Sequence, residues 1–213
     1  MKKKLYIISG SPDVDYEYIK SINFKNKVIY AVDSGMEVCK NLKIRPDKII
    51  GDFDTYNIDS ELKNYDKNMV YRFSTDKNRS DTEIAVDMGL KKNFEKIIIL
   101  NATGSRLDHE MFNINLTFKK PGSIIVDNNI GKFIALKKNE LNTINMKRHK
   151  EFSLVPLGVI KNLTIKNARY ELKNKDVNLN SLTLSNKATE NKVNINFDSG
   201  KLLIYIVKGN LNG

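Results

Sequence analysis

Short apolar runs alternate with segments of helical periodicity over roughly the first 120 residues of the chain. The apolar runs are nearly continuous, which is typical of strands that helices cover on both faces. They predict strands at 5–8, 28–32, 48–50, 69–73 and 96–100. The segments between them predict helices at 16–22, 34–42, 81–92 and 108–118. Because strands that alternate with helices build parallel sheets, we expect an α/β N-terminal domain with a mainly parallel sheet.

The pattern changes at Lys119-Lys120-Pro121-Gly122, and helical spacing largely disappears beyond it. Val193, Ile195 and Phe197 alternate with asparagines, which is the period of a half-buried antiparallel strand. Strands are predicted at 124–126, 132–136, 152–155, 163–165, 179–184, 193–197 and 202–207. We therefore expect a smaller all-β domain, a sandwich or a barrel, so that residues 1–121 form the first domain and 122–213 the second.

Charge and cysteine content narrow the classes of protein. Lys and Arg number 36 against 25 Asp and Glu in 213 residues, a net charge of +11 that suits a nucleic acid or an anionic small substrate. The lysines are scattered, and no aromatic-interleaved basic motif occurs, so we expect no nucleic-acid partner. The single cysteine, Cys39, can form no internal disulfide, and no apolar run is long enough to span a membrane. We expect a soluble, cytoplasmic protein.

Acidic residues follow the predicted strands of the first domain. Ligands of open parallel sheets bind beyond the carboxyl ends of the strands, so we expect these residues on one rim of the sheet. They are Asp33, Asp52, Asp54, Asp81 and Asp108.

Asp52 and Asp54 are two residues apart, and in an extended segment both carboxylates point to the same side. Such carboxylates repel each other unless a cation lies between them. Mg²⁺ binds one or two carboxylates together with water and substrate phosphates, and this spacing supplies that. The alternative is a polar turn, in which Asp is a good turn former. Together with the other strand ends, the pattern favours magnesium.

The next two motifs predict helix N-termini. Ser80-Asp81-Thr82-Glu83 matches a capping box, yet a helix N-terminus also binds phosphate, and Lys77 is near enough to reach the same anion. Arg106 suits bidentate phosphate binding, and Asp108 suits a metal or a cationic substrate. The alternative for these two is a surface ion pair at the start of a helix. His109 taken alone is typical of a buried histidine satisfied by hydrogen bonds.

Several other chemistries lack their motifs. The sequence contains no P-loop, no Gly-x-Gly-x-x-Gly fingerprint and no Gly-x-Ser-x-Gly elbow. Zinc is disfavoured because there are one cysteine and two distant histidines.

The motifs resemble, in order, the signature of the thiamine pyrophosphokinase (thiamine diphosphokinase) family. They are Ala31-Val32-Asp33-Ser34-Gly35, Gly51-Asp52-Phe53-Asp54, Lys77-Asn78-Arg79-Ser80-Asp81-Thr82-Glu83 and Gly104-Ser105-Arg106-Leu107-Asp108-His109. Two later segments, 152–157 and 182–186, are similar to parts of that family's β domain. The resemblance therefore covers nearly the whole chain.

The resemblance implies an α/β domain followed by a β-sandwich, and a homodimer with active sites between subunits. It implies transfer of the diphosphoryl group of ATP to the hydroxyl of thiamine, with Mg²⁺ as cofactor and AMP as the second product. Carried over by position, the resemblance implies catalytic roles for Asp33, Asp52, Asp54, Asp81 and Asp108, of which Asp52, Asp54 and Asp81 would bind the metal. It implies ATP binding by Lys77, Arg106 and His109, and thiamine binding by Ser185 and Asn186.

The chain departs from the family pattern in two ways. Ser34 and Ser105 stand where the family often has glycine, and we expect serine to be tolerated because it is small. The chain has no tryptophan, so any aromatic stacking on thiamine comes from Tyr or Phe.

Three alternatives stay open at the level of sequence. A related magnesium-dependent enzyme could use another alcohol, such as a pterin or a pyridoxine-like compound, and only the Ser185-Asn186 segment and the whole-chain match argue against it. A nucleotide or thiamine sensor without turnover is disfavoured because all five aspartates are present. A basic nucleic-acid-binding protein would show steep salt dependence and indifference to magnesium.

Overall fold

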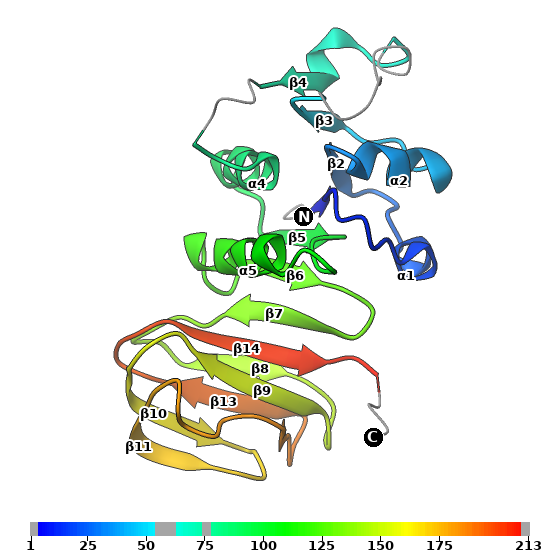
Figure 1. The fold of residues 1–213 in the computed structure, drawn as a ribbon. Helices are drawn as coiled ribbons and strands as arrows, with labels where there is room; N and C mark the ends of the chain where they lie inside the picture. The colour runs from blue at the N-terminus through cyan, green and yellow to red at the C-terminus, as the bar shows by residue number, and fades with distance from the viewer. Residues whose placement is uncertain (1–3, 54–62, 74–77, 210–213) are drawn as a thin grey trace. The chain divides into compact units, whose positions relative to one another are not determined.

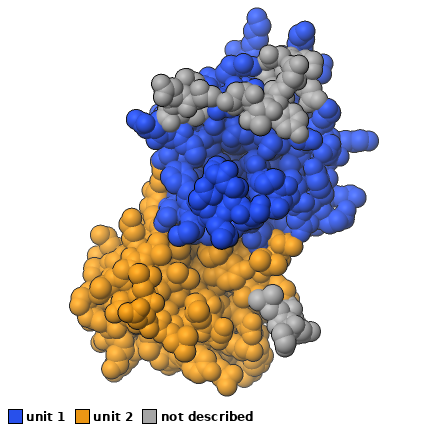
Figure 2. Space-filling view, in the orientation of Figure 1, with its two compact units in different colours: residues 1–116, 126–128 blue, residues 117–125, 129–213 orange. Residues whose placement is uncertain are grey.

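The computed structural model describes residues 4–53, 63–73 and 78–209. These form two compact units, which Figure 2 shows in blue and orange. The first contains Met1–Leu116 and Val126–Asn128, and the second contains Thr117–Ile125 and Asn129–Gly213. The sequence placed the boundary between the domains after residue 121. That position lies inside Thr117–Ile125, a segment of the second unit, and the next three residues, Val126–Asn128, belong to the first unit again.

The first unit is built on a parallel sheet in the order β5-β1-β2-β3-β4 (Figure 1). The strands are β1 (Lys4–Ile8), β2 (Val28–Val32), β3 (Lys48–Gly51), β4 (Val70–Arg72) and β5 (Lys96–Leu100). Leu5, Ile49 and Ile97 are fully buried, as expected of strands covered on both faces. The prediction of an α/β domain with a mainly parallel sheet is confirmed.

Helices cover both faces of this sheet. They are α1 (Tyr16–Ser21), α2 (Gly35–Asn41), α4 (Asp81–Lys91) and α5 (Leu107–Asn115), with short 3₁₀ turns η1 (Lys67–Met69) and η2 (Leu116–Lys119). Figure 1 shows α1 and α2 on one side of the strands and α4 on the other. This placement follows from right-handed crossovers between parallel strands. The chain runs in one direction across the sheet from β1 to β3 and in the opposite direction from β4 to β5, so the helices of the two stretches lie on opposite faces.

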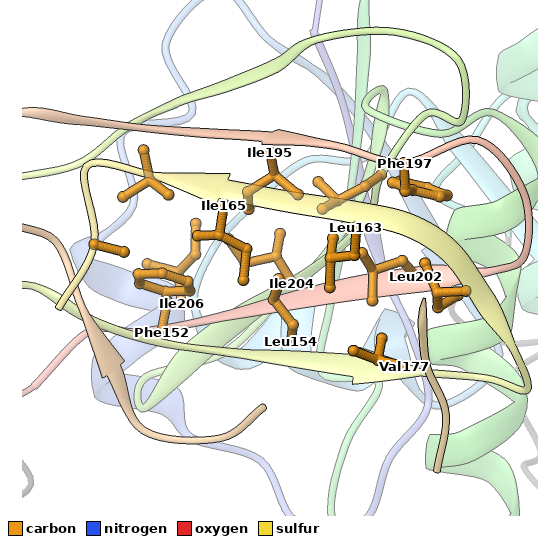
Figure 3. Packing of buried hydrophobic residues seen from close by; sticks show 14 of the residues in the cluster. Phe152, Leu154, Leu163, Ile165, Val177, Ile195, Phe197, Leu202, Ile204 and Ile206 are labelled. Carbon is orange, nitrogen blue, oxygen red and sulfur yellow. The ribbon is translucent and has the colours of Figure 1, made fainter. Parts of the chain in front are cut away.

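The second unit contains two antiparallel sheets, ordered β12-β9-β14-β7 and β11-β10-β13-β8. Their strands are β7 (Gly131–Ala135), β8 (Asn142–Asn145), β9 (Glu151–Pro156), β10 (Ile160–Lys166), β11 (Leu172–Val177), β12 (Asn186–Lys187), β13 (Lys192–Asn196) and β14 (Leu202–Val207); β6 (Ile124–Asp127) has residues in both units. Apolar side chains from both sheets, among them Phe152, Leu163 and Ile204, fill one core (Figure 3). The all-β prediction is confirmed.

One strand prediction is wrong. Residues 179–184 form turns and irregular chain, and Leu179 and Leu182 are 70% and 89% exposed. The Asn178 side chain accepts the backbone N–H of Asn180, and the Ser181 hydroxyl accepts that of Asn178. These local hydrogen bonds favour a turn over a strand.

Three strands were not predicted, namely β8, β11 and β12. Their sequences are rich in Asn and Lys, and all three are the outermost strands of their sheets in the order given above. An outer strand buries fewer side chains, so its hydrophobic periodicity is weak.

Among the described residues, no helix is long and apolar enough to cross a membrane.

Candidate active site

A cavity of about 800 Å³ lies in the first unit, where the strands β1, β2, β3 and β5 end and the helices α4 and α5 begin. Six residues predicted for the site line it. They are Asp33, Asp52, Asp81, Arg106, Asp108 and His109. Asp54 and Lys77 lie outside the described residues. The carboxyl edge of the sheet thus collects the acidic side chains as expected for an open parallel sheet.

Asp33 is placed by a backbone conformation that few residues adopt. Its φ is +49°, in the left-handed region that Asp tolerates, and its N–H donates to the carbonyl of Ile50 at 2.9 Å. A Cβ on Gly51 would lie only 2.5 Å from Asp33 Oδ1. Gly51 therefore leaves the space in which the Asp33 carboxylate sits, beside Asp52.

Asp81 is the first residue of α4 and is only 9% exposed. The Ser80 hydroxyl caps this helix by accepting the backbone N–H of Glu83 at 3.1 Å, as the capping box predicts. Thr82 Oγ1 and Ser9 Oγ share a buried hydrogen bond of 2.6 Å, which ties the first turn of α4 to the end of β1. Asp81 consequently faces the cavity from a helix N-terminus whose position is held from two sides.

Arg106 and Asp108 form a bidentate ion pair at the start of α5. Nε of Arg106 donates to Oδ1 of Asp108 at 3.0 Å, and Nη2 donates to Oδ2 at 2.8 Å. These hydrogen bonds hold the pKa of Asp108 well below its usual range and raise the pKa of Arg106. Both side chains are more than half exposed, so a ligand reaches them easily. The surface ion pair considered from the sequence is therefore present, on residues that also line the cavity.

The expectation of a buried His109 is wrong. Its side chain is 66% exposed, and Nε2 lies 3.9 Å from Asp108 Oδ2. The neighbouring residues Arg106 and Leu107 are also more than half exposed. The imidazole is thus open to a ligand in the cavity.

Within the described part of the chain, no three Asp, Glu, His or Cys side chains are close enough to form a preformed metal site. Asp33, Asp52 and Asp81 nevertheless offer hard oxygen donors to one cavity. Mg²⁺ needs only one or two carboxylates when substrate phosphates complete its coordination, so this donor set fits that ion.

Ser34 fits its position without a glycine conformation. Its φ is −62°, and its hydroxyl donates to the carbonyl of Gly10 at 3.1 Å. The serine that departs from the family pattern therefore joins two loops at the cavity.

Ser185 and Asn186 lie in the second unit. Asn186 is buried, its Nδ2 donates to the carbonyl of Tyr170 at 2.8 Å, and its Oδ1 accepts the N–H of Tyr170 at 3.0 Å. Oδ1 also accepts the N–H of Lys187. The amide is thus occupied in holding the backbone of Tyr170, a residue that is 57% exposed. Sequence reasoning did not single out Tyr170, although the absence of tryptophan directed attention to Tyr and Phe.

Two family models match the chain. The catalytic domain of thiamin pyrophosphokinase matches residues 19–126, which is half of the chain, and the vitamin B1 binding domain of thiamin pyrophosphokinase matches residues 139–202. The chain belongs to the thiamin pyrophosphokinase family. The six predicted site residues that line the cavity lie in the first match, and Ser185 and Asn186 lie in the second.

Relatives and solved structures agree with this assignment. The chain is 26% identical to thiamine pyrophosphokinase of Bacillus subtilis (strain 168), over 95% of this chain and 97% of the relative. A crystal structure of thiamine pyrophosphokinase from Bacillus subtilis superposes with a TM-score of 0.83, at 23% identity over 97% of this chain and 99% of that one. One from Geobacillus thermodenitrificans also gives 0.83, at 21% identity over 98% and 99%. The predictions of the thiamin pyrophosphokinase family and of an enzyme are confirmed.

Proposed function

We propose that this chain transfers the diphosphoryl group of ATP to the hydroxyl of thiamine, giving thiamine diphosphate and AMP. One observation carries the proposal: the acidic cavity lies in a unit that matches the catalytic domain, and the same chain continues into the vitamin B1 binding domain. A cavity of about 800 Å³ is in the size range of sites that enclose a small-molecule ligand.

ATP would bind with its phosphates at the N-terminal ends of α4 and α5. The positive end of the α4 dipole and the guanidinium of Arg106 both favour anions there. An exposed ion pair is weak, so the phosphates of ATP can replace Asp108 as the partner of Arg106. His109 and Lys77 are further proposed contacts to ATP.

Asp52, Asp54 and Asp81 would hold Mg²⁺. The ion, when bound, would offset charge on the phosphate oxygens of ATP during the reaction. Asp81 is suited to this role because the capped helix fixes its backbone, and Asp52 because it enters the same cavity from the end of β3.

The remaining carboxylates would act on thiamine. In the transfer, the thiamine hydroxyl oxygen forms a bond to the β-phosphorus of ATP while the bond from that phosphorus to the oxygen of AMP breaks. One carboxylate accepts the hydroxyl proton, and another offsets the positive charge of the thiazolium. Asp33 and Asp108 are the candidates, and positioning by the cavity supplies much of the rate enhancement.

Thiamine would also contact the second unit, and two chains would share each site. Asn186 holds the backbone of the exposed Tyr170, whose ring we propose as the aromatic surface for thiamine, and Ser185 is a further proposed contact. Large apolar side chains are exposed in both units, including Leu107 and Met111 on α5 and Leu182 in the second unit. They support a homodimer, because a second subunit would cover them. Location in the cytoplasm stays a prediction from the sequence.

AMP release tests the proposal directly. The protein is incubated with ATP and Mg²⁺, with and without thiamine, and the mass of the product is determined. AMP that depends on thiamine and equals the thiamine diphosphate formed is expected. ADP would instead indicate transfer of a single phosphoryl group, and no turnover with thiamine would point to another alcohol or to a sensor.

A further inference from the structure

Asp13, in the loop between β1 and α1, is an acidic residue that the predicted site does not include. Its Oδ2 accepts a hydrogen bond from the backbone N–H of Ser105 at 2.5 Å. Among the described residues, Gly104 and Arg106 on either side of Ser105 line the cavity, whereas Asp13 does not. The Asp13 carboxylate therefore contacts the loop that carries Arg106 and not the space in which a ligand binds.

The absence of a side chain at Gly104 permits this close approach. Gly104 has a φ of +145°, and a Cβ there would lie 2.4 Å from Asp13 Oδ2 and 2.9 Å from Ser11 Oγ. Both distances are too short for a stable contact, so a side chain at 104 would push the Asp13 carboxylate and the Ser11 hydroxyl out of their present positions. Glycine at 104 thus serves two purposes, the unusual φ and direct packing of the loop on the Asp13 carboxylate.

The segment that leads to Asp13 is itself anchored. Nδ2 of the buried Asn101 donates to the carbonyls of Ser9 and Ser11, at 2.8 and 2.9 Å. The N–H of Ser11 donates to the carbonyl of Asn101 at 3.1 Å, and its hydroxyl donates to that of Thr103 at 2.8 Å. The loops after β1 and β5 are therefore joined along their length. Asp13 adds the contact that is nearest to Arg106.

A second carboxylate holds the neighbouring amide. Oε2 of Glu110, in the first turns of α5, accepts the N–H of Gly104 at 3.0 Å. Two consecutive amides, those of Gly104 and Ser105, thus donate to carboxylates from two different elements. Hydrogen bonds to a charged acceptor are stronger than those between neutral groups. Those from Ser105 also lower the pKa of Asp13, so its carboxylate stays charged near neutral pH.

We propose that Asp13 is a positioning residue for the nucleotide: by holding the backbone at Ser105, it sets the direction from which the Arg106 guanidinium meets the phosphates of ATP. The inference rests on the proposed function, in which Arg106 binds ATP. A guanidinium makes two parallel hydrogen bonds to phosphate only in a narrow range of orientations, so a displaced loop weakens them.

Two variants of Asp13 separate positioning from folding. Asp13→Ala removes the acceptor and is expected to raise the KM for ATP about three- to tenfold while kcat changes less than about twofold. The unfolding temperature is expected to stay unchanged because the side chain is exposed. Asp13→Asn keeps an oxygen that can accept the Ser105 N–H, so it is expected to recover most of the ATP affinity.

Asp176→Ala is the matched control. Asp176 is an exposed aspartate of the second unit that likewise accepts a backbone N–H, from Asn162, and pairs with Lys161. The control is expected to leave the KM for ATP unchanged. An unchanged KM in Asp13→Ala, or a KM in Asp13→Asn as high as that of Asp13→Ala, would overturn the inference.

Equilibrium binding of Mg-ATP without thiamine keeps this test apart from that of the reaction. The dissociation constant is expected to rise in Asp13→Ala by the same factor as the KM, with faster hydrogen exchange at the Ser105 amide. If the wild type bound Mg-ATP but formed no thiamine diphosphate, the proposed function would fail and the ratio of dissociation constants would still decide on Asp13. A wild type that does not bind Mg-ATP overturns both.

Discussion

Gly51 and Asp33 illustrate how single residues shape the cavity. A side chain at 51 would collide with the Asp33 carboxylate, and Asp33 itself adopts a positive φ to reach that position. Asp52 follows directly, so the end of β3 makes room for one carboxylate and the next residue supplies another. The role of this glycine concerns close approach and not backbone freedom, since its φ is not in the left-handed region.

Asp52→Asn tests the acidic cavity. The substitution keeps the size of the side chain and removes its charge, so magnesium and phosphate binding should weaken. We expect kcat to fall by roughly 100-fold or more, with the unfolding temperature nearly unchanged. Asp198→Asn, which changes an exposed aspartate of the second unit, is the control and should keep full activity. Near-normal turnover in Asp52→Asn would remove Asp52 from the proposed metal site.

The ion pair with Arg106 makes a prediction about pH. Hydrogen bonds from Arg106 hold the pKa of Asp108 below its usual range. Any stability that the pair contributes is therefore fully present at pH values above the ordinary pKa of Asp, and it is lost as the pH falls through the lowered pKa. In Arg106→Gln the pKa of Asp108 should rise toward the ordinary value of about 3.9. An NMR titration of the Asp108 carboxyl group in both proteins measures this. Equal pKa values would show that the pair does not persist in solution.

A side-chain cap holds the N-terminus of α4, the helix that carries Asp81. The Ser80 hydroxyl accepts the N–H of Glu83, and replacing a serine cap with alanine costs about 1 kcal/mol. We therefore expect Ser80→Ala to lower the free energy of unfolding by about that amount, measured by urea denaturation. Ser80→Asp retains a cap and should restore most of the stability. A Ser80→Ala protein as stable as the wild type would mean that other contacts, such as Thr82 with Ser9, hold the helix alone.

The strands show which elements a sequence can predict. The central strands β1 and β2 were located within a residue because both of their faces are buried, and a continuous apolar run signals that state. The polar outer strands β8 and β11 gave no such signal, since their pairing depends on partners far along the chain. The segment 179–184 misled for a different reason: Leu182 and Leu184 are two residues apart, as in a strand, but both side chains are exposed.

At the scale of the whole molecule, shared active sites can be tested by mixing two inactive variants. Asp52→Asn alters the first unit, and Tyr170→Ala alters the second at an exposed ring. If each site combines the first unit of one subunit with the second unit of its partner, a mixed dimer contains one intact site. Random mixing should then restore up to about a quarter of the wild-type activity.

The control mixes Asp52→Asn with Asp81→Asn, both in the first unit, and should restore nothing. Co-expression with two affinity tags isolates the mixed dimers, and light scattering measures the oligomeric state. A monomer, or no recovery with Asp52→Asn and Tyr170→Ala, would contradict sites shared between subunits.

The sequence by itself determined the fold class of both units, the family and most of the acidic cavity. It could do so because parallel topology brings the ends of the strands to one edge, wherever the residues stand in the chain. Asp33, Asp52, Asp81 and Asp108 therefore came together as expected, while Asp54 and Lys77 lie outside the described residues.

Only the tertiary structure decided which polar groups contact one another. It paired Arg106 with Asp108, left His109 exposed at the cavity and occupied the amide of Asn186 with the backbone of Tyr170. It also brought Asp13 onto Ser105, 92 residues away in the chain. No periodicity or motif encodes such contacts, because a hydrogen bond depends on distances and angles that are set only when the loops pack.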